Sequence, residues 1–578
     1  MKQAIMSGRE IVTLQLGHYA NFTGSHWWNL QEASFVYDPK VLQRFPKEIS
    51  HDVLFREGQT PKRCVTFTPR LVVLDLRGSL STLRKDGSLY NEEKEEEVKW
   101  SGDVTLHKSA TEPKNQFLQD LDRVEGTDES KGDVDNIDLE SPRENEEDGK
   151  DQAEDITEQA VFGSKLYNLD NQVKVWSDFH AVHLHPRSIQ LVQDYTLGSE
   201  DNPFDVFGLG QQALSGQAWD EWEDRVRFFT EECDNMQGFH VLFDNHNSFG
   251  GAASKVLSYL QDEFPGKAVL TFPLTPAVLP DQTARQRATR ILNSALCMAS
   301  CCLDSSVYVP LSLATSLWRN LGAPQNFPHL TYNCDLHYHT SAVLAASLDT
   351  MTLPLRKETN PVHLSEVTGA MSALGRKVAS LNTSLPFPMM EHETFVDALM
   401  SKGEEHLLQP LTPQTYCQAD PSVQSCVVRG IPPDRVKRAG KSSPRQLSAC
   451  SSVDDVLQLY LTETYPSTMN AGCVMRDPSN VVTPFPHIFR PNVTKAGQLS
   501  DTLRRPRSGV ESVPMMTSLQ SGPSVGSHVS SLHDEAARFN IHRHHHFLGA
   551  GLEEEEFREN LDRLHSLADC YRVLPDMS

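Results

Sequence analysis

Short apolar runs and longer amphipathic stretches alternate along most of this chain. Residues 10–16 and 70–76 are rich in Val, Ile and Leu and have the length of strands. The second run is apolar on both faces, which is typical of a strand in a sheet covered by helices on each side. Two further buried strands are predicted at residues 239–243 and 268–272.

Helical stretches lie between and after these runs, and we predict helices at residues 21–32, 219–233, 252–262, 284–303 and 343–350. Strands that alternate with helices favour an α/β fold whose sheet is mostly parallel and flanked by helices. From residue 389 the pattern is mixed and Pro is frequent. We therefore expect a compact first segment at 9–90, a core at 160–388 and a second, α+β region at 389–500.

The segment between the first two of these units is strongly acidic. Residues 91–160 hold 24 Asp and Glu against 8 Lys and Arg, so two thirds of the net charge of −24 lies there. Apolar residues are sparse, so burial does not offset the chain entropy that folding would cost. We predict a long disordered acidic insertion at 91–159, which is either a solvated spacer or an acidic interaction tail.

The last part of the chain reads as a linker followed by helix. Residues 503–530 are rich in Ser, Pro and Gly, so we expect a flexible linker at 501–535 and a helical segment at 536–578. A second polar stretch, at 429–452, is basic. Within 553–572 the apolar residues recur at helical spacing: Phe557, Leu561, Leu564, Ala568 and Tyr571.

This amphipathic helix has three interpretations, namely packing on the body of the protein, binding a partner, or lying on a membrane. Its polar face is rich in Glu, whereas helices that lie in a membrane interface usually carry Lys and Arg there. Packing on the protein's own core is therefore the interpretation we favour, and lipid contact is the least favoured.

Composition and charge narrow the class of protein. The charge of −24 disfavours nucleic-acid binding and electrostatic attachment to anionic lipid. No run of 18 apolar residues predicts a transmembrane helix, and the first residues resemble neither a secretory signal nor a mitochondrial presequence. The 11 Cys include no CxxC pair, and Cys297, Cys301 and Cys302 read as buried thiols. We expect a cytosol-facing protein.

Several motifs resemble tubulins, in the tubulin order. Residues 9–24 (REIVTLQLGHYANFTG) resemble the first tubulin strand and phosphate loop, and 70–76 (RLVVLDL) resemble the next strand. The motifs DRVR at 224–227, QGF at 237–239 and PFP at 386–388 resemble later tubulin segments. The resemblance implies a tubulin-like fold with a nucleotide-binding-type domain.

Other stretches are absent from ordinary tubulins. WWNLQE at 27–32, WSDF at 176–179 and LHPRS at 184–188, together with the acidic insertion, resemble the Misato family over residues 9–493. That resemblance implies a cytosolic protein associated with the mitochondrial outer membrane, which supports mitochondrial distribution, morphology and fusion. It also implies a role around microtubules and the spindle.

A tubulin-type nucleotide site needs backbone N–H groups that approach phosphates closely. The first loop keeps Gly17, Asn21 and Gly24. It has the bulkier His18, Tyr19 and Ala20 in place of the middle Gln-Cys-Gly of tubulins, and His18 can still donate to a phosphate. The second, glycine-rich loop is degenerate, and Asp244 lies just upstream of it. Residues left to contact phosphate there are Asn247, Ser248, Gly250 and Gly251. We expect no cofactor, with GTP as the alternative.

Hydrolysis has less support than binding. In tubulins a carboxylate from a loop between the central helix and the Pro-Phe-Pro segment serves the reaction. We place the corresponding loop at residues 375–384, which contain no Asp or Glu. Without a carboxylate the chemistry has no base, so we predict that the protein is not an enzyme.

Three groups of His residues are candidates for metal binding or acid–base catalysis. His542, His544, His545 and His546 form an exposed-looking run, His337 and His339 lie close to Cys334, and His180, His183 and His185 share a short segment. None has a partner set at zinc spacing, and no nucleophile motif accompanies them. Structural roles are favoured for all three, and no metal site is predicted.

Two functions of different class remain. The first is a non-catalytic, tubulin-like interaction protein at the cytosolic face of the mitochondrial outer membrane, held there peripherally by a protein partner. The alternative is a GTP-binding cytoskeletal protein that acts on microtubules or the spindle. Tubulin and microtubule-associated proteins are candidate partners, and nucleic acid is not one.

Overall fold

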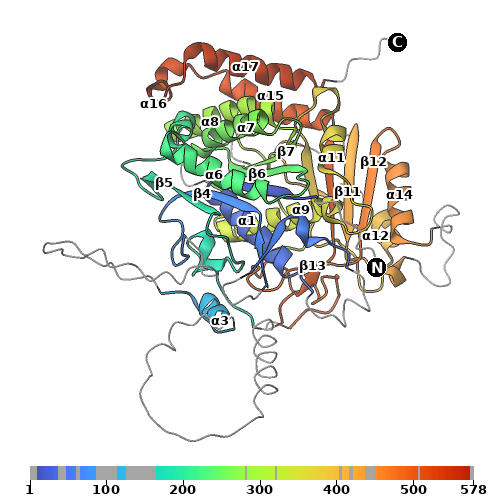
Figure 1. Cartoon of the computed structure of the whole chain (residues 1–578). Coiled ribbons are helices and arrows are strands. Elements are labelled where there is room, and N and C mark those ends of the chain that lie inside the picture. The colour runs from blue at the N-terminus through green and yellow to red at the C-terminus, as the bar shows by residue number, and fades with distance from the viewer. Residues whose placement is uncertain are drawn as a thin grey trace, which may run out of the picture.

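The computed structural model describes residues 9–36, 47–59, 65–85, 113–124, 165–279, 283–318, 322–401, 407–415, 421–436, 450–505 and 508–572. Two larger sheets, each with its own helices, make up most of this part of the chain (Figure 1). The helix α9 (His337–Met351) packs against the helix α1 (His18–Glu32) of the first sheet and against strands of the second.

The first sheet is parallel throughout, as predicted. Its strands in spatial order are β5 (Ile189–Thr196), β4 (Leu71–Arg77), β1 (Ile11–Leu16), β6 (Gly238–Asp244), β7 (Ala268–Leu274) and β8 (Val307–Tyr308). Every residue of β1, β6 and β7 is buried, because helices cover both faces of the sheet. This arrangement explains why these strands read as continuous apolar runs.

Two helical layers enclose this sheet. One layer consists of α1 (His18–Glu32) and α9, whose apolar side chains form a core with one face of the strands. The other layer consists of α5 (Phe207–Ala213), α6 (Gln217–Glu231), α7 (Phe249–Glu263) and α8 (Ala284–Asp304). Each predicted helix of this region is present, and most begin or end within a few residues of the predicted bounds.

The second sheet is mixed. Its order is β10 (Gln409–Pro410), β9 (Ser380–Ser384), β15 (Met515–Ser521), β11 (Val423–Arg429) and β12 (Met469–Met475). Only β11 and β12 are parallel neighbours. Short elements around it are α10 (Leu353–Arg356), α11 (Leu364–Met371), α12 (Phe395–Ser401) and α14 (Val453–Thr464). Two small ladders pair β2 (Phe55–Gln59) with β3 (Val65–Pro69), and β13 (Ser479–Asn480) with β14 (Ser512–Val513).

The prediction of a flexible linker at 501–535 is wrong. Residues in that range form β15, the middle strand of the second sheet, and most of the helix α15 (Pro523–Ala536). The polar side chains of β15 are buried in a ladder that crosses the strands. Gln520 accepts a hydrogen bond from Asn382 at 2.9 Å and donates to Gln424 at 3.1 Å, so the amide of this buried side chain is satisfied inside the sheet.

The prediction that residues 91–159 lack fixed structure is wrong for residues 113–124. These residues include the helix α3 (Gln116–Val124), which packs on the body through Phe117, whose ring meets Tyr167 edge to face. Asp120 pairs with Lys165 and accepts a 2.7 Å hydrogen bond from the Tyr167 hydroxyl. Apolar burial and these polar contacts outweigh the acidic composition here. The rest of the range lies outside the described residues.

The C-terminal helix α17 (Glu554–Asp569) packs on the body. With α15 it lies against α8, over the outer side of the first sheet's helical layer (Figure 1). Phe557, Leu564 and Ala568 are buried, and the hydroxyl of Tyr571 donates a 2.6 Å hydrogen bond to the carbonyl of Val378. None of the helices in the described ranges is long and apolar enough to cross a membrane.

A buried charge cluster joins the two sheets. Asp349 of α9 accepts hydrogen bonds of 2.7 Å from both Arg356 of α10 and Arg429 of β11. Arg356 also reaches Gln31 of α1 at 3.2 Å. Burial alone would favour the neutral acid, but the two guanidinium groups more than compensate and lower the pKa of Asp349. The central helix is thereby fixed between both halves of the molecule.

Candidate functional site

The carboxyl edge of the parallel sheet is the place where this architecture positions a ligand. Chain order runs outward from β1 through β4 to β5, then returns to the other side of β1 with β6. The order therefore reverses between β1 and β6, and open parallel sheets bind ligands at such a reversal. The first loop, after β1, and the second loop, after β6, both end there.

A carboxylate of the protein occupies the start of α1. Asp244, the last residue of β6, accepts hydrogen bonds from the backbone N–H of Tyr19 at 3.2 Å and of Ala20 at 2.8 Å. The N–H of Asn21 already donates to the carbonyl of Gly17 at 2.9 Å. Free N–H groups of a first helical turn attract phosphates and other anions. Here Asp244 fills that anion position from within the chain.

Gly17 makes this arrangement sterically feasible. Its φ of 115° lies in the region that favours glycine, and a Cβ there would stand 2.6 Å from the Cγ of Asp244. The glycine of the first loop, which the sequence suggests for phosphate approach, instead allows close approach of a side chain. The loop and Asp244 are therefore fitted to each other.

Burial raises the pKa of Asp244 to about 7, although the N–H groups of Ala20 and Tyr19 favour the carboxylate and oppose that rise. The neighbouring His18 helps to lower this pKa, while Asp75 raises it. Near neutral pH the group is thus poised between the acid and the carboxylate. Its proton occupancy controls how much negative charge faces the start of α1.

A second buried carboxylate, Asp75 of β4, is the partner of two residues that were predicted to contact phosphate, Asn21 and His18. It accepts hydrogen bonds from the Asn21 side chain at 2.9 Å and from the Trp176 indole N–H at 2.8 Å. His18 Nδ1 lies 3.3 Å from the same oxygen of Asp75. Burial opposes protonation of His18, but the carboxylates of Asp75, Asp244 and Asp178 outweigh it and raise its pKa.

The N–H groups of the first four residues of α7 all have partners within the protein. Phe249 N–H donates to the Asn247 side chain, Gly250 N–H to the Asn247 carbonyl, and the N–H groups of Gly251 and Ala252 to the Ser248 carbonyl. The Ser248 hydroxyl donates to the carbonyl of Val206 at 2.7 Å. These contacts are all internal to the protein.

The glycines of the second loop serve helix packing. A Cβ on Gly251 would lie 1.9 Å from the carbonyl oxygen of Phe207 in α5, and one on Gly250 would lie 3.1 Å from the sulfur of Cys297 in α8. Of the predicted contacts, Gly17, His18, Asn21 and Asn247 gather around Asp75 and Asp244. Ser248, Gly250 and Gly251 face neighbouring helices.

The predicted counterpart of the tubulin catalytic loop is misplaced. Residues 375–384 are not a loop, because they include the buried strand β9. The link that follows the central helix and α10 is residues 357–363, which contain Glu358. The lack of acidic residues in 375–384 therefore says nothing about hydrolysis, because these residues do not form the loop that follows the central helix.

Members of all three His groups pack on or pair with other residues, and in the group at 180–185 the ring of His185 stacks on Phe228. His339 contacts Asp170 at 2.9 Å, while the ring of His337 packs on Tyr19 and Phe22. His546 bonds Thr289 of α8 at 3.0 Å. Within the described ranges, no group of three or more His, Cys, Asp or Glu is arranged to hold a metal ion.

Comparison with known proteins places the chain in a family. Residues 9–123 match the model of the Misato Segment II tubulin-like domain, and residues 167–357 match that of the Tubulin domain. Protein misato homolog 1 of Danio rerio is 39% identical over 582 residues, or 98% of each chain. The Homo sapiens protein of the same name is 36% identical over 580 residues, again 98% of each.

Protein misato of Drosophila melanogaster is 30% identical over 578 residues, which cover 97% of this chain and 98% of its own length. This chain belongs to the Misato family. The tubulin-like fold predicted from the sequence is confirmed by the matching domain models and the parallel sheet. The names of these relatives are not enzyme names.

A stretch whose sequence resembles the Misato family also contributes a residue to the site. Trp176, which donates to Asp75, lies in the 3-10 turn Trp176–Phe179, the same stretch whose motif resembles the Misato family. Neither Asp75 nor Trp176 was predicted as a site residue. One signal was available, since Asp75 is the only acidic residue of the mainly apolar strand β4 and a buried carboxylate needs partners.

Proposed function

We propose that this chain is a non-catalytic, tubulin-like interaction protein that regulates mitochondrial distribution, morphology and fusion at the cytosolic face of the outer membrane. One observation carries the non-catalytic part. Asp244 binds the N–H groups at the start of α1, where a nucleotide phosphate would have to bind. The mitochondrial part rests on membership of the Misato family and on what that resemblance implies.

Measuring the nucleotide that copurifies with the protein tests the non-catalytic part of the proposal. The full-length chain is purified without added nucleotide and denatured, and the soluble fraction is separated by chromatography. We expect far less than one guanine nucleotide per chain, and GTP turnover no faster than a buffer blank, with or without tubulin. Stoichiometric guanine nucleotide would overturn the proposal.

We propose that the protein attaches to the outer membrane through a protein receptor. The apolar face of α17 is used within the molecule, and the first turn of that helix carries Glu554, Glu555 and Glu556. Carbonate at high pH should strip the protein from isolated mitochondria, and trypsin treatment of the mitochondria should abolish rebinding. Equal binding to protein-free liposomes of outer-membrane composition would contradict a receptor.

A second function, that of a GTP-binding cytoskeletal protein, is favoured by one observation. Arg290 of α8 is only 3% exposed, and none of its three guanidinium nitrogens has a hydrogen-bond partner among the described residues. Burial and nearby Arg287 lower its pKa to about 10. Its charge acts on His246, which adjoins the second loop. A buried guanidinium without a partner is costly, and a bound anion would relieve that cost.

A further inference from the structure

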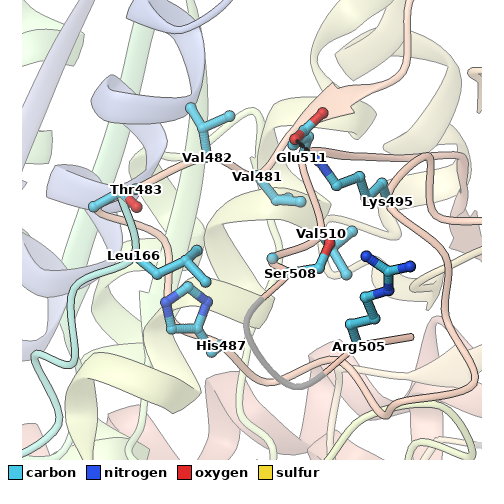
Figure 2. A pocket seen from close by; sticks show the side chains of 11 residues that line it. Leu166, Val481, Val482, Thr483, His487, Lys495, Arg505, Ser508, Val510 and Glu511 are labelled. Atoms are coloured by element: carbon cyan, nitrogen blue, oxygen red, sulfur yellow. Dashed lines mark hydrogen bonds and ion pairs between the residues drawn. The ribbon is translucent and has the colours of Figure 1, made fainter. Parts of the chain in front are cut away.

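A pocket of about 570 Å³ lies beside the small β13–β14 ladder, on residues that the carboxyl edge of the sheet does not use. Its volume falls within the usual range for small-ligand sites. Backbone bonds fix its walls, because Val481 N–H donates to the Glu511 carbonyl and Glu511 N–H to the Lys495 carbonyl, both at 2.9 Å. Figure 2 shows side chains from separate loops around this hollow.

One side of the pocket is apolar. Val481 and Val510 are buried side chains of its wall, and Leu166 lies at its edge with 41% of its surface exposed. Leu166 packs over Gly509, where a Cβ would stand 2.7 Å from its Cδ2. An exposed leucine beside buried valines offers apolar area that a ligand would cover.

The other side carries positive charge. Lys495 pairs with Glu511 at 2.9 Å, so the only acidic side chain of the lining is already matched. The guanidinium of Arg505 has no ion-pair or hydrogen-bond partner within the ranges the structure describes. Arginine recognises carboxylates through two parallel N–H bonds. In a chain of net charge −24, this free arginine beside apolar surface selects for a small anion.

We propose that the pocket binds an aliphatic carboxylate, with the carboxylate on Arg505 and the hydrocarbon against Leu166, Val481 and Val510. The carboxylate belongs either to a small organic acid or to the C-terminal residue of a peptide that ends in an aliphatic side chain. Both sources share the chemistry that the pocket offers, namely one guanidinium and an apolar wall. Binding here is independent of the state of Asp244.

The test compares hexanoate with hexanamide, which has the same hydrocarbon but no charge, by ligand-observed saturation-transfer NMR on the full-length chain. We expect hexanoate to bind and hexanamide to bind at least about tenfold more weakly, as loss of a charged hydrogen bond implies. Arg505→Gln should weaken hexanoate by a similar factor and remove the preference for the acid. Leu166→Ala should weaken both ligands.

Arg543→Gln is the matched control, because Arg543 is also exposed but lies in the 3-10 turn Ile541–Arg543, away from the pocket. Hexanoate binding should be unchanged in that variant. Equal binding of acid and amide, or equal loss in the two arginine variants, would overturn the proposal. A peptide ending in Leu with a free carboxylate, compared with its amidated form, distinguishes the sources: tighter binding than hexanoate identifies a peptide C-terminus, and weaker binding a small acid.

Discussion

The helices α1 and α7 both begin at the carboxyl edge of the parallel sheet, yet their first turns are closed in different ways. At α1 the N–H groups of Tyr19 and Ala20 are held by the side chain of Asp244, a residue distant in sequence. At α7 the N–H groups are satisfied by the loop itself, and the backbone of α5 lies against Gly251.

At α1 the anion position is present but occupied by Asp244, whereas at α7 the loop itself satisfies the N–H groups. Removing one carboxylate would free two N–H groups at the start of α1, whereas at α7 truncation of Asn247 would free only the N–H of Phe249, because the next three N–H groups are bonded to backbone carbonyls. The Misato chain thus keeps the backbone geometry of a phosphate loop at α1 but supplies the anion itself. At α7 the glycines instead allow neighbouring helices to pack closely.

The largest effect is expected at α7, from Gly251→Ala. The added Cβ would lie 1.9 Å from the Phe207 carbonyl oxygen, so α5 must move. We expect a loss of about 3 kcal/mol in the free energy of unfolding, at the upper end of the cost of overpacking. Urea denaturation followed by circular dichroism measures it.

Gly369→Ala in α11 is the control for that variant, since nothing lies within 4 Å of a Cβ at that position. Helix propensity alone should make it neutral or stabilising by about 1 kcal/mol. If Gly251→Ala behaved like Gly369→Ala, the close contact between α7 and α5 would be wrong.

The next effect concerns pH and Asp244→Asn. Burial raises the pKa of Asp244 from 3.8 to about 7, so between these values the folded protein keeps a proton that the unfolded chain has lost. This group therefore lowers stability as pH rises through that window, and its contribution is constant above it. The asparagine variant lacks the effect.

The free energy of unfolding of the wild type minus that of the variant should thus fall by on the order of 3 kcal/mol between about pH 4 and pH 7. Titrating groups that do not interact with Asp244 contribute equally to both proteins and cancel, whereas His18, whose pKa Asp244 helps to raise, contributes to the difference. Parallel urea titrations across this range give the difference. A difference that does not change with pH would show that Asp244 is not a buried, titrating carboxyl.

A smaller effect on stability is expected from removing one hydrogen-bond donor to Asp75. Trp176→Phe removes the indole N–H that donates to Asp75 at 2.8 Å, whereas the indole N–H of the equally buried Trp222 has no partner among the described residues. Trp176→Phe should therefore cost about 1–2 kcal/mol more in unfolding free energy than Trp222→Phe. Equal costs, measured by thermal unfolding, would mean that the Asp75 contact contributes nothing.

The first sheet was predictable because its strands are buried on both faces, so β1, β4, β6 and β7 stand out as apolar runs. The strand β15 was not, since its Ser, Thr and Gln residues resemble a linker in composition, and only the fold shows that Ser518 and Gln520 bond to a neighbouring strand. The helix α3 was missed because two buried apolar side chains, Phe117 and Leu118, are few within a long acidic stretch.

The site was predictable only in outline. Sequence pattern located both loops and the conflict between Asp244 and phosphate. It could not show that the carboxylate reaches the N–H groups of α1, because that contact depends on β1 and β6 being neighbours in register. The role of Trp176 likewise requires the fold, since its partner Asp75 is distant in sequence.

Asp244 stands where a phosphate would otherwise bind, so its removal should produce a gain of anion binding at the start of α1. Thermal unfolding is followed for wild type, Asp244→Ala and Ser248→Ala in phosphate and in chloride of equal ionic strength. We expect phosphate to raise the unfolding temperature, relative to chloride, in Asp244→Ala alone, because a ligand that binds only the folded state stabilises it. Ser248→Ala frees no N–H group at α7 and should respond like wild type. A phosphate response in wild type as large as in Asp244→Ala would contradict the claim.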